Sequence, residues 1–279
     1  MRTRHLAVLP AAIAASLLLA ACGGSDDASG DAGDGGVQLV SDGSLTVCTN
    51  PPYEPFEYEE DGEIVGLDIA IVGEVAKDLG VDVVTKVTPF EGIQSGADLN
   101  TGNCDVVASG ITITEERQAK IDFSDPYFDA NQGLLVPEGS DLDSVDALEG
   151  KKIGVQQATT GETWAQDNGL EIVQFEDLGL QVQALKTGQI DAAVNDIAVL
   201  GSFVSEGFEV SAEFSTGEQY GLGVKQGNTA LLDAINGTLD RIREDGTYDA
   251  LYTEFIGTAP ASSSTGAATA SAEPSPSDG

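Results

Sequence analysis

The chain has 279 residues and carries 47 acidic residues against 12 basic ones, a formal net charge of −35 at pH 7. A surface this acidic repels nucleic acid and anionic lipid, so electrostatic binding of nucleic acid is excluded. Its single histidine is His5, near the start of the chain, which leaves no histidine for a catalytic triad or a zinc site in the later sequence.

The first residues have the features of an export signal. Arg2 and Arg4 form a basic region, and the apolar run 6–18 is too short to span a bilayer stably. Leu19-Ala20-Ala21-Cys22 is similar to the lipobox of bacterial lipoproteins. We therefore predict a lipoprotein signal peptide over 1–21 and a lipid anchor at Cys22, on the extracytoplasmic face of the cell membrane. The alternative is a freely secreted protein cleaved nearby.

Removal of this segment would leave 10 basic residues against 47 acidic ones, a net charge of −37 and no histidine. We expect no metal and no cofactor. Residues 22–43, rich in Gly, Asp and Ser, predict a flexible tether, and the Ala/Ser/Thr/Pro-rich tail 258–279 predicts a second disordered segment.

The sequence between these segments alternates strand and helix patterns, which indicates α/β architecture with parallel sheets. A helix over 68–79 has Asp68 as its expected cap and Gly80 as its end. The other predicted elements are strands 45–49, 81–87, 105–110, 152–155, 171–175 and 191–194, and helices 90–101, 161–168, 178–187, 231–243 and 248–255.

One short pattern occurs twice. Leu99 to Val107 reads L-N-T-G-N-C-D-V-V, and Leu185 to Ala193 reads L-K-T-G-Q-I-D-A-A. In each copy a helix is expected to end at Gly before a strand that begins with Asp. Two similar units predict two lobes around one cleft. We expect Asp191, the aspartate of the second copy, to be structural and paired with local backbone.

Two cysteines, Cys48 and Cys104, remain after the predicted signal peptide. Both are expected on strands, and in an oxidising compartment a disulfide is feasible if those strands are neighbours. The alternative is a pair of buried free thiols that pack as small apolar side chains.

The segment S-G-I-T-I-T-E-E-R, Ser109 to Arg117, follows a short apolar strand. Thr114 is a good helix N-cap, which places Arg117 in the first turn of a helix at the carboxyl end of that strand. Ligands of open α/β sheets bind there, and a guanidinium can take a carboxylate bidentately with help from the Thr112 hydroxyl. The alternative is a surface arginine on an ordinary strand–turn–helix.

Two further groups follow predicted strands. Asp196 comes directly after the apolar strand that starts at Asp191, so its charge would need a partner if buried. Thr160-Gly161 opens a predicted helix, whose N-terminal N–H groups could bind an anion; the alternative for Thr160 is helix capping alone.

Six motifs occur in order along the chain: P-P-Y-E-P-F-E-Y (51–58), G-x-x-V-G-L-D-I-A (62–70), T-I-T-E-E-R with F-S-D-P-Y (112–127), G-V-Q-Q-A-T-T-G-E (154–162), G-Q-I-D-A-A-V-N-D (188–196) and D-G-T-Y (245–248). With these motifs the chain resembles the family 3 solute-binding proteins, the extracytoplasmic receptors of polar amino-acid ABC transporters. This resemblance implies an α/β, two-lobed periplasmic-binding-protein-like fold (type II), each lobe a mainly parallel sheet flanked by helices, joined by a two-strand hinge.

The resemblance also implies lobe boundaries. Lobe 1 is expected over 44–130 plus 223–257, and hinge strands with lobe 2 over 131–222. The two crossings between the lobes are expected near 131–136 and 217–222.

The family pattern further assigns roles to single residues. It gives Thr160 a bond to the ligand carboxylate, Asp196 the ligand ammonium, Gly110 a backbone carbonyl to that ammonium, and Thr112 a hydroxyl to the carboxylate.

Three residues are expected to contact the ligand side chain. Tyr53 and Phe90 are candidate aromatic walls, although core packing is the common role of an aromatic residue. Asn50 stands where some relatives carry a carboxylate for a cationic ligand. An amide there disfavours lysine or arginine and suits an amide or a hydroxyl.

The expected function is a monomeric, lipid-anchored receptor that binds a free, polar amino acid and delivers it to an ABC transporter permease. We do not expect an enzyme. The alternatives are a carboxylate-based lyase, with Glu91 or Glu162 as acid or base, and an amino-acid-sensing ectodomain.

Overall fold

The computed structural model describes residues 36–257, apart from the side chains of residues 205 and 206. The predicted signal peptide, the lipidation site Cys22 and the predicted tail 258–279 lie outside the described residues.

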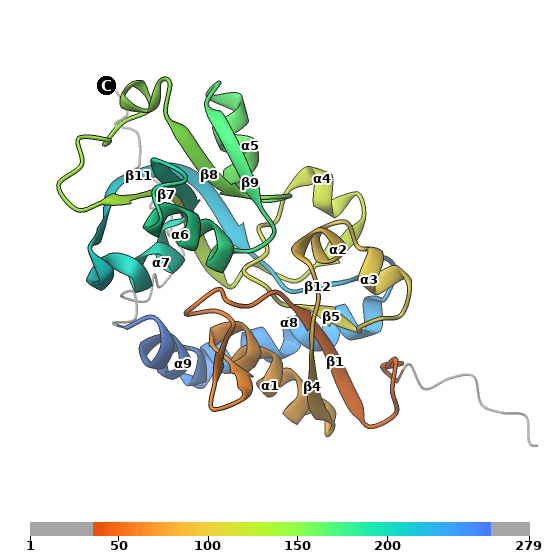
Figure 1. Ribbon diagram of the computed structural model, residues 1–279. Coiled ribbons are helices and arrows are strands. Elements are labelled where there is room, and N and C mark those ends of the chain that lie inside the picture. Colours follow the sequence, from red (N-terminus) through yellow and green to blue (C-terminus); the bar gives the residue numbers. More distant parts are fainter. Residues whose placement is uncertain (1–35, 258–279) are drawn as a thin grey trace, which may run out of the picture. The chain divides into compact units, whose positions relative to one another are not determined.

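The described chain forms two five-stranded sheets, a hairpin and flanking helices (Figure 1). The strands are β1 Ser44–Thr49, β2 Tyr58–Glu60, β3 Glu63–Val65, β4 Asp82–Val87, β5 Val106–Val107, β6 Ile121–Phe123, β7 Phe128–Pro137, β8 Lys152–Gln156, β9 Glu171–Phe175, β10 Ala192–Asp196, β11 Phe208–Tyr220 and β12 Gly223–Lys225. The helices are α1 Leu67–Leu79, α2 Phe90–Gln94, α3 Ala97–Asn100, α4 Glu115–Gln118, η1 Asp146–Leu148, α5 Thr160–Asp167, α6 Leu178–Lys186, α7 Ile197–Leu200, η2 Gly201–Glu206, α8 Thr229–Glu244 and α9 Thr247–Phe255.

The two sheets share one topology. The first has the order β4-β1-β5-β12-β6 and the second the order β9-β8-β10-β7-β11. In each sheet the first three strands are parallel, the fourth is antiparallel, and the fifth pairs antiparallel with the fourth. Four of the five strands in each sheet therefore run in the same direction, and both sheets are mainly parallel.

The long strands β7 and β11 connect the two sheets. β7 begins five residues after β6 of the first sheet, and β11 ends three residues before β12 of the same sheet. β7 and β11 pair antiparallel with each other, with register irregularities near Val210 and between Phe214 and Glu218. The chain thus enters and leaves the second sheet on two adjacent strands.

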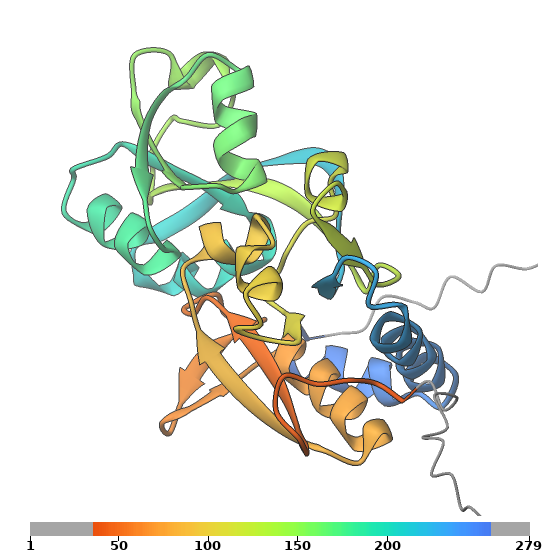
Figure 2. The same ribbon diagram turned by 90° about the vertical axis from the view of Figure 1, so that its right-hand side faces the viewer.

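Helices on opposite faces bury the apolar sides of each sheet. In the first sheet α1 packs with α8 and α9, which return to it from the end of the described chain (Figures 1 and 2). α1 buries the stripe Ile71, Val72, Val75 and Ala76, and α8 buries Leu231, Ile235, Leu239 and Ile242. Both stripes have the helical spacing of an amphipathic element.

The repeated sequence pattern has a structural counterpart. The Asp105 carboxylate accepts hydrogen bonds from the backbone N–H groups of Thr46, at 2.8 Å, and Val40. The Asp191 carboxylate accepts one from the backbone N–H of Lys152, also at 2.8 Å. Each aspartate therefore ties the loop before the third strand in the order of its sheet, β5 or β10, to the second strand, β1 or β8. The structural role expected for Asp191 is confirmed.

Three predicted elements differ in the structure. Asp68 does not cap α1: Gly66 occupies the N-cap, and Asp68 is buried and accepts from the Gly110 backbone N–H and the Tyr127 hydroxyl. The predicted helix 90–101 is split into α2 and α3 because Gly96 adopts a left-handed conformation, φ 71°. The predicted strand 105–110 is reduced to β5, since the residues after Val107 turn into the site described below.

The end of the predicted tether is ordered against the first sheet. Val37 and Leu39 pack against the core, and the backbone N–H of Val40 donates to the Asp105 carboxylate at 2.6 Å. The tether prediction therefore remains only for the residues before 36, which the structure does not describe.

The structure joins Cys48 and Cys104 by a disulfide, with their Cα atoms 5.7 Å apart. The two residues are 56 positions apart and lie in one buried cluster with Phe90 and Ile93. In the chain-entropy model, closure of a loop of this length reduces the entropy of the unfolded chain, which stabilises the folded state by about 4 kcal/mol at 25 °C.

We expect the double variant Cys48→Ala/Cys104→Ala to lose about 2–4 kcal/mol of the free energy of unfolding, measured by denaturant titration. The single variants serve as controls, because each should lose about as much as the pair. Two titratable thiols in the parent protein purified from an oxidising compartment would contradict the bridge.

Candidate functional site

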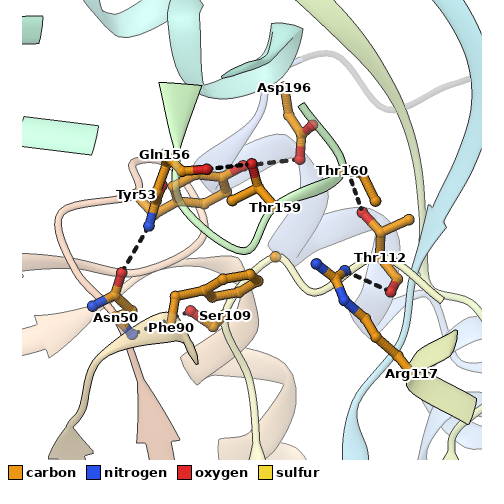
Figure 3. A pocket seen from close by; sticks show the side chains of 11 residues that line it. Asn50, Tyr53, Phe90, Ser109, Thr112, Arg117, Gln156, Thr159, Thr160 and Asp196 are labelled. Carbon is orange, nitrogen blue, oxygen red and sulfur yellow. Dashed lines mark hydrogen bonds between the residues drawn. The ribbon is translucent and has the colours of Figure 1, made fainter. Parts of the chain in front are cut away.

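A cavity lies among loops and helix starts at the carboxyl ends of strands from both sheets (Figure 3). All eight ligand-binding residues predicted from the sequence line it, together with Ser109, Gln156 and Thr159, which were not predicted. The lining residues are Asn50, Tyr53, Phe90, Ser109, Gly110, Thr112, Arg117, Gln156, Thr159, Thr160 and Asp196.

Arg117 is a buried cation in this cavity. Thr114 caps α4 as predicted, its hydroxyl accepting from the Arg117 backbone N–H at 3.2 Å, and this fixes the side chain in the first turn. The guanidinium is 4% exposed, donates to the backbone carbonyls of Thr112 at 2.8 Å and Ala158 at 3.1 Å, and lies 5.3 Å from the Phe90 ring centroid.

No carboxylate of residues 36–257 lies within ion-pair distance of Arg117. Burial lowers the pKa of Arg117, while the more distant charges of Asp196 and Glu218 raise it. Because a guanidinium stays protonated in proteins, a buried positive charge with unused N–H donors remains. This arrangement favours an anion, and a carboxylate fits the planar fork best.

The two threonines predicted for the carboxylate approach Arg117 from different sheets. The hydroxyl oxygens of Thr112 and Thr160 are 3.5 Å apart. Thr159, not Thr160, caps α5, since its hydroxyl accepts from the Glu162 backbone N–H at 3.1 Å. The capping alternative for Thr160 is therefore wrong, and its hydroxyl faces the cavity at the positive end of α5.

Asp196 is a buried anion at the end of β10. Its side chain is 5% exposed and accepts hydrogen bonds from the hydroxyls of Tyr53, at 2.8 Å, and Tyr220, and from the Gln132 amide. Burial, followed by the charge of Glu218, raises the pKa of Asp196 to about 6, and the three donors act in the opposite direction. A cation placed beside Asp196 would restore its ordinary acidity.

Gly110 lies where the chain passes closest to Tyr53. Its φ is +49°, and a Cβ there would stand 2.6 Å from the Tyr53 ring, so a larger residue would not fit. Its N–H donates to the Asp68 carboxylate at 2.8 Å, while its carbonyl takes part in no hydrogen bond between described residues. That carbonyl is free to accept from a ligand.

Two amides lie across the cavity from Arg117 (Figure 3). The Asn50 amide donates to the Thr88 carbonyl at 3.0 Å and accepts from the Gln156 amide at 2.9 Å. Ser109 is bonded to Asn50: its hydroxyl accepts from the Asn50 backbone N–H and donates to the Glu57 carboxyl at 2.6 Å.

The site is held together by direct contacts between residues of the two sheets. Tyr53 bonds Asp196, Asn50 bonds Gln156, and Arg117 bonds the Ala158 carbonyl. In each pair the first residue follows or precedes a strand of the first sheet, and the second belongs to the second sheet or the loop after β8. The structure therefore has the two halves of the site in contact around the cavity.

Sequence reasoning missed five polar residues of the site. Ser109 directly precedes the predicted Gly110, and Gln156 and Thr159 lie in the motif at 154–162. The sequence could therefore have indicated these three residues as part of the site. Gln132 and Tyr220 lie on β7 and β11, and no local pattern links them to Asp196.

The two glutamates considered as acid or base do not line the cavity. Glu91 is exposed on α2, and the Glu162 carboxylate is taken by the Ala158 backbone N–H and the amides of Gln166 and Gln174.

Within residues 36–257 we find no cluster of His, Cys, Asp and Glu that could hold a metal ion. Among the helices of that range, none has the length and apolar character needed to cross a membrane.

Comparison with known proteins identifies the family. Residues 45–258 match the model of the bacterial extracellular solute-binding proteins, family 3. The chain belongs to this family. It is 34% identical to the probable histidine-binding protein of Neisseria gonorrhoeae, over 89% of this chain and 94% of that one. It is also 34% identical to the ABC transporter glutamine-binding protein GlnH of Bacillus subtilis (strain 168), over 88% and 95%.

Among solved structures, an ancestral arginine-binding protein bound to arginine is 40% identical, with a TM-score of 0.73 over 77% of this chain and 99% of that one. This likeness confirms the predicted two-lobed type II fold. The resemblance deduced from the six sequence motifs is confirmed as well.

Proposed function

We propose that this solute-binding protein is a receptor for a free amino acid, held as a zwitterion between Arg117 and Asp196. The single observation that carries the proposal is the presence, in one cavity, of a buried cation without an anion and a buried anion without a cation. A ligand with one carboxylate and one ammonium neutralises both.

In this proposal the ligand carboxylate lies between the Arg117 guanidinium and the hydroxyls of Thr112 and Thr160. The ligand ammonium lies between the Asp196 carboxylate and the Gly110 carbonyl. Residues of both sheets then contact the same molecule, so the ligand stabilises the arrangement in which the two halves meet. Asn50, Tyr53 and Phe90 contact its side chain.

We also propose that the mature chain is anchored through a lipid at Cys22 and works as a monomer that passes the amino acid to an ABC transporter permease. The lipobox-like run Leu19 to Cys22 supports the anchor, and the relatives named above support the transport role. A Cys22→Ala variant, expressed in a bacterium that processes lipoproteins, should move from the membrane fraction to the soluble fraction.

A thermal-shift screen against the twenty amino acids tests the central part of the proposal. A ligand that binds only the folded state increases the free energy of unfolding, by about 2.7 kcal/mol at a hundredfold excess over Kd, and so raises the melting temperature. At least one amino acid should do so and be recovered chemically unchanged. If none does, the receptor proposal is wrong; if the ligand is recovered dehydrated or deaminated, the protein is an enzyme.

A further inference from the structure

The side-chain end of the cavity has an orientation that the hydrogen bonds determine. The Asn50 amide nitrogen must face the Thr88 carbonyl, which can only accept, at 3.0 Å. The Asn50 oxygen therefore faces Gln156, and Gln156 must present its nitrogen to it, at 2.9 Å. These two contacts fix the assignment of nitrogen and oxygen in both amides, which shape alone does not determine.

The consequence is an unpaired acceptor. Gln156 is 2% exposed, and its Oε1 is buried without a hydrogen-bond donor from any residue that the structure describes. Gln156 is one of the residues that line the cavity. An acceptor buried without a partner costs about 1–3 kcal/mol, which a ligand N–H or O–H placed there would recover.

At the side-chain end of the cavity, no charged residue of the described chain is left to pair with a charged ligand side chain. Among the described residues that line the cavity, Arg117 and Asp196 are the only Asp, Glu, Lys or Arg, and the proposed function uses both for the amino-acid backbone. The nearby Glu57 does not line the cavity: it is fully buried, bonded to the Ser109 hydroxyl, and burial raises its pKa well above the usual range. A charged ligand side chain would be desolvated here without a counter-ion.

The side-chain amides of Asn50 and Gln156 also have N–H donors that take part in no hydrogen bond with a residue that the structure describes. Asn50 uses one of its two amide hydrogens on the Thr88 carbonyl, and Gln156 uses one on Asn50. Beside the unpaired Gln156 oxygen, the pocket therefore presents both an acceptor and an N–H donor. The complementary group is a neutral one with a donor and an acceptor on one short chain, which is the description of a carboxamide.

We propose that Gln156, together with Asn50, makes this receptor selective for an amino acid with a carboxamide side chain, glutamine or asparagine. The ligand N–H donates to Gln156 Oε1 and the ligand carbonyl accepts from the amide pair, with the rings of Tyr53 and Phe90 beside the aliphatic part. This inference rests on the proposed function, because it assumes that Arg117 and Asp196 hold the ligand backbone.

The test is isothermal titration calorimetry of the full mature chain with glutamine, asparagine, glutamate, methionine and arginine. The better of the two carboxamides should bind at least about tenfold more tightly than methionine, which lacks the polar groups. Glutamate and arginine, whose charges find no partner, should bind more weakly still. A parent protein that binds arginine or glutamate more tightly than both carboxamides would overturn the inference while leaving the amino-acid receptor intact.

Variants separate the role of Gln156 from general packing. Gln156→Met keeps the length of the side chain and should weaken binding of the preferred carboxamide about tenfold or more, while methionine binding changes by less than about threefold. Asn50→Asp introduces a carboxylate and should shift the preference toward arginine. The matched control Gln226→Met changes an exposed glutamine on the first-sheet side and should have no effect.

The outcomes are distinguishable from failure of the proposed function. Binding of no amino acid at all would remove both. Normal binding of the carboxamide by a folded Gln156→Met variant would remove only the selectivity, and if that variant does not fold, the ligand ranking of the parent protein decides alone.

Discussion

Arg117→Met is expected to reduce amino-acid affinity by about 30-fold to several thousand-fold, which corresponds to the 2–5 kcal/mol typical for loss of one partner of a buried charge pair. The Arg117 guanidinium is buried and has no carboxylate of the described chain within ion-pair distance, so the ligand carboxylate is its expected counter-ion. Without the cation, the ligand carboxylate would be desolvated unpaired.

The same substitution should leave the stability of the ligand-free protein unchanged or higher. A buried cation held only by two carbonyl dipoles and an aromatic face is costly, and replacement by an apolar side chain of similar length removes that cost. Calorimetry measures the affinity and denaturant titration the stability. Lys120→Met, three residues further along the chain, changes a half-exposed lysine that pairs with Glu116 and is the control for charge.

Affinity within threefold of the parent for the Arg117→Met variant would contradict the assignment. A large loss of stability would contradict it differently, since it would give Arg117 a structural role.

Asp196→Asn is expected to have an effect of similar size and to remove the pH dependence of binding. The ligand ammonium needs an ionised partner, and the pKa of Asp196 is raised to about 6, first by burial and then by the charge of Glu218. In the parent protein the apparent Kd should therefore rise as the pH falls below about 6, approaching tenfold per pH unit. The side chain at position 196 of the Asp196→Asn variant cannot ionise, so the weak binding of the ligand to this variant should be constant between pH 5 and 7.5.

The stability of the ligand-free protein should change in the opposite direction. The pKa values of Asp196 and Asp68 are both raised to about 6, so the folded state holds more protons than the unfolded state between about pH 4 and 6. These two groups therefore lower the free energy of unfolding as the pH rises through that window, while binding strengthens. Weaker binding at low pH together with higher stability of the ligand-free protein could not be caused by acid unfolding, because unfolding would lower the stability.

Titration calorimetry between pH 5 and 7.5, with melting temperatures recorded at each pH, measures both trends. A parent Kd that is constant across this range would contradict a role for the Asp196 charge in binding.

Much of this fold and site could be predicted because its signals are local. The strand and helix patterns come from short apolar periodicities. Arg117 and Asp196 follow predicted strands and Gly110 ends one, and the carboxyl ends of parallel strands meet at one edge of a sheet. Thr114 capped its helix as its sequence position indicates. The family resemblance supplied the roles of the remaining predicted residues, and all eight line one cavity.

The parts that could not be predicted depend on contacts between distant segments. The local sequence around Asp68 indicates an N-cap. In the structure its buried carboxylate instead accepts hydrogen bonds from the Gly110 N–H and the Tyr127 hydroxyl, which lie 42 and 59 residues away in the sequence. Gln132 and Tyr220 reach Asp196 from the two connecting strands. The unpaired oxygen of Gln156 follows only from the orientation of Asn50, a residue of the other half.

The most direct measurement is a crystal structure of the protein with its bound amino acid. We expect the ligand carboxylate within hydrogen-bond distance of the Arg117 guanidinium and the ligand ammonium within hydrogen-bond distance of the Asp196 carboxylate. A ligand bound in this cavity with neither end on these two side chains, or bound at another place on the protein, would contradict the account.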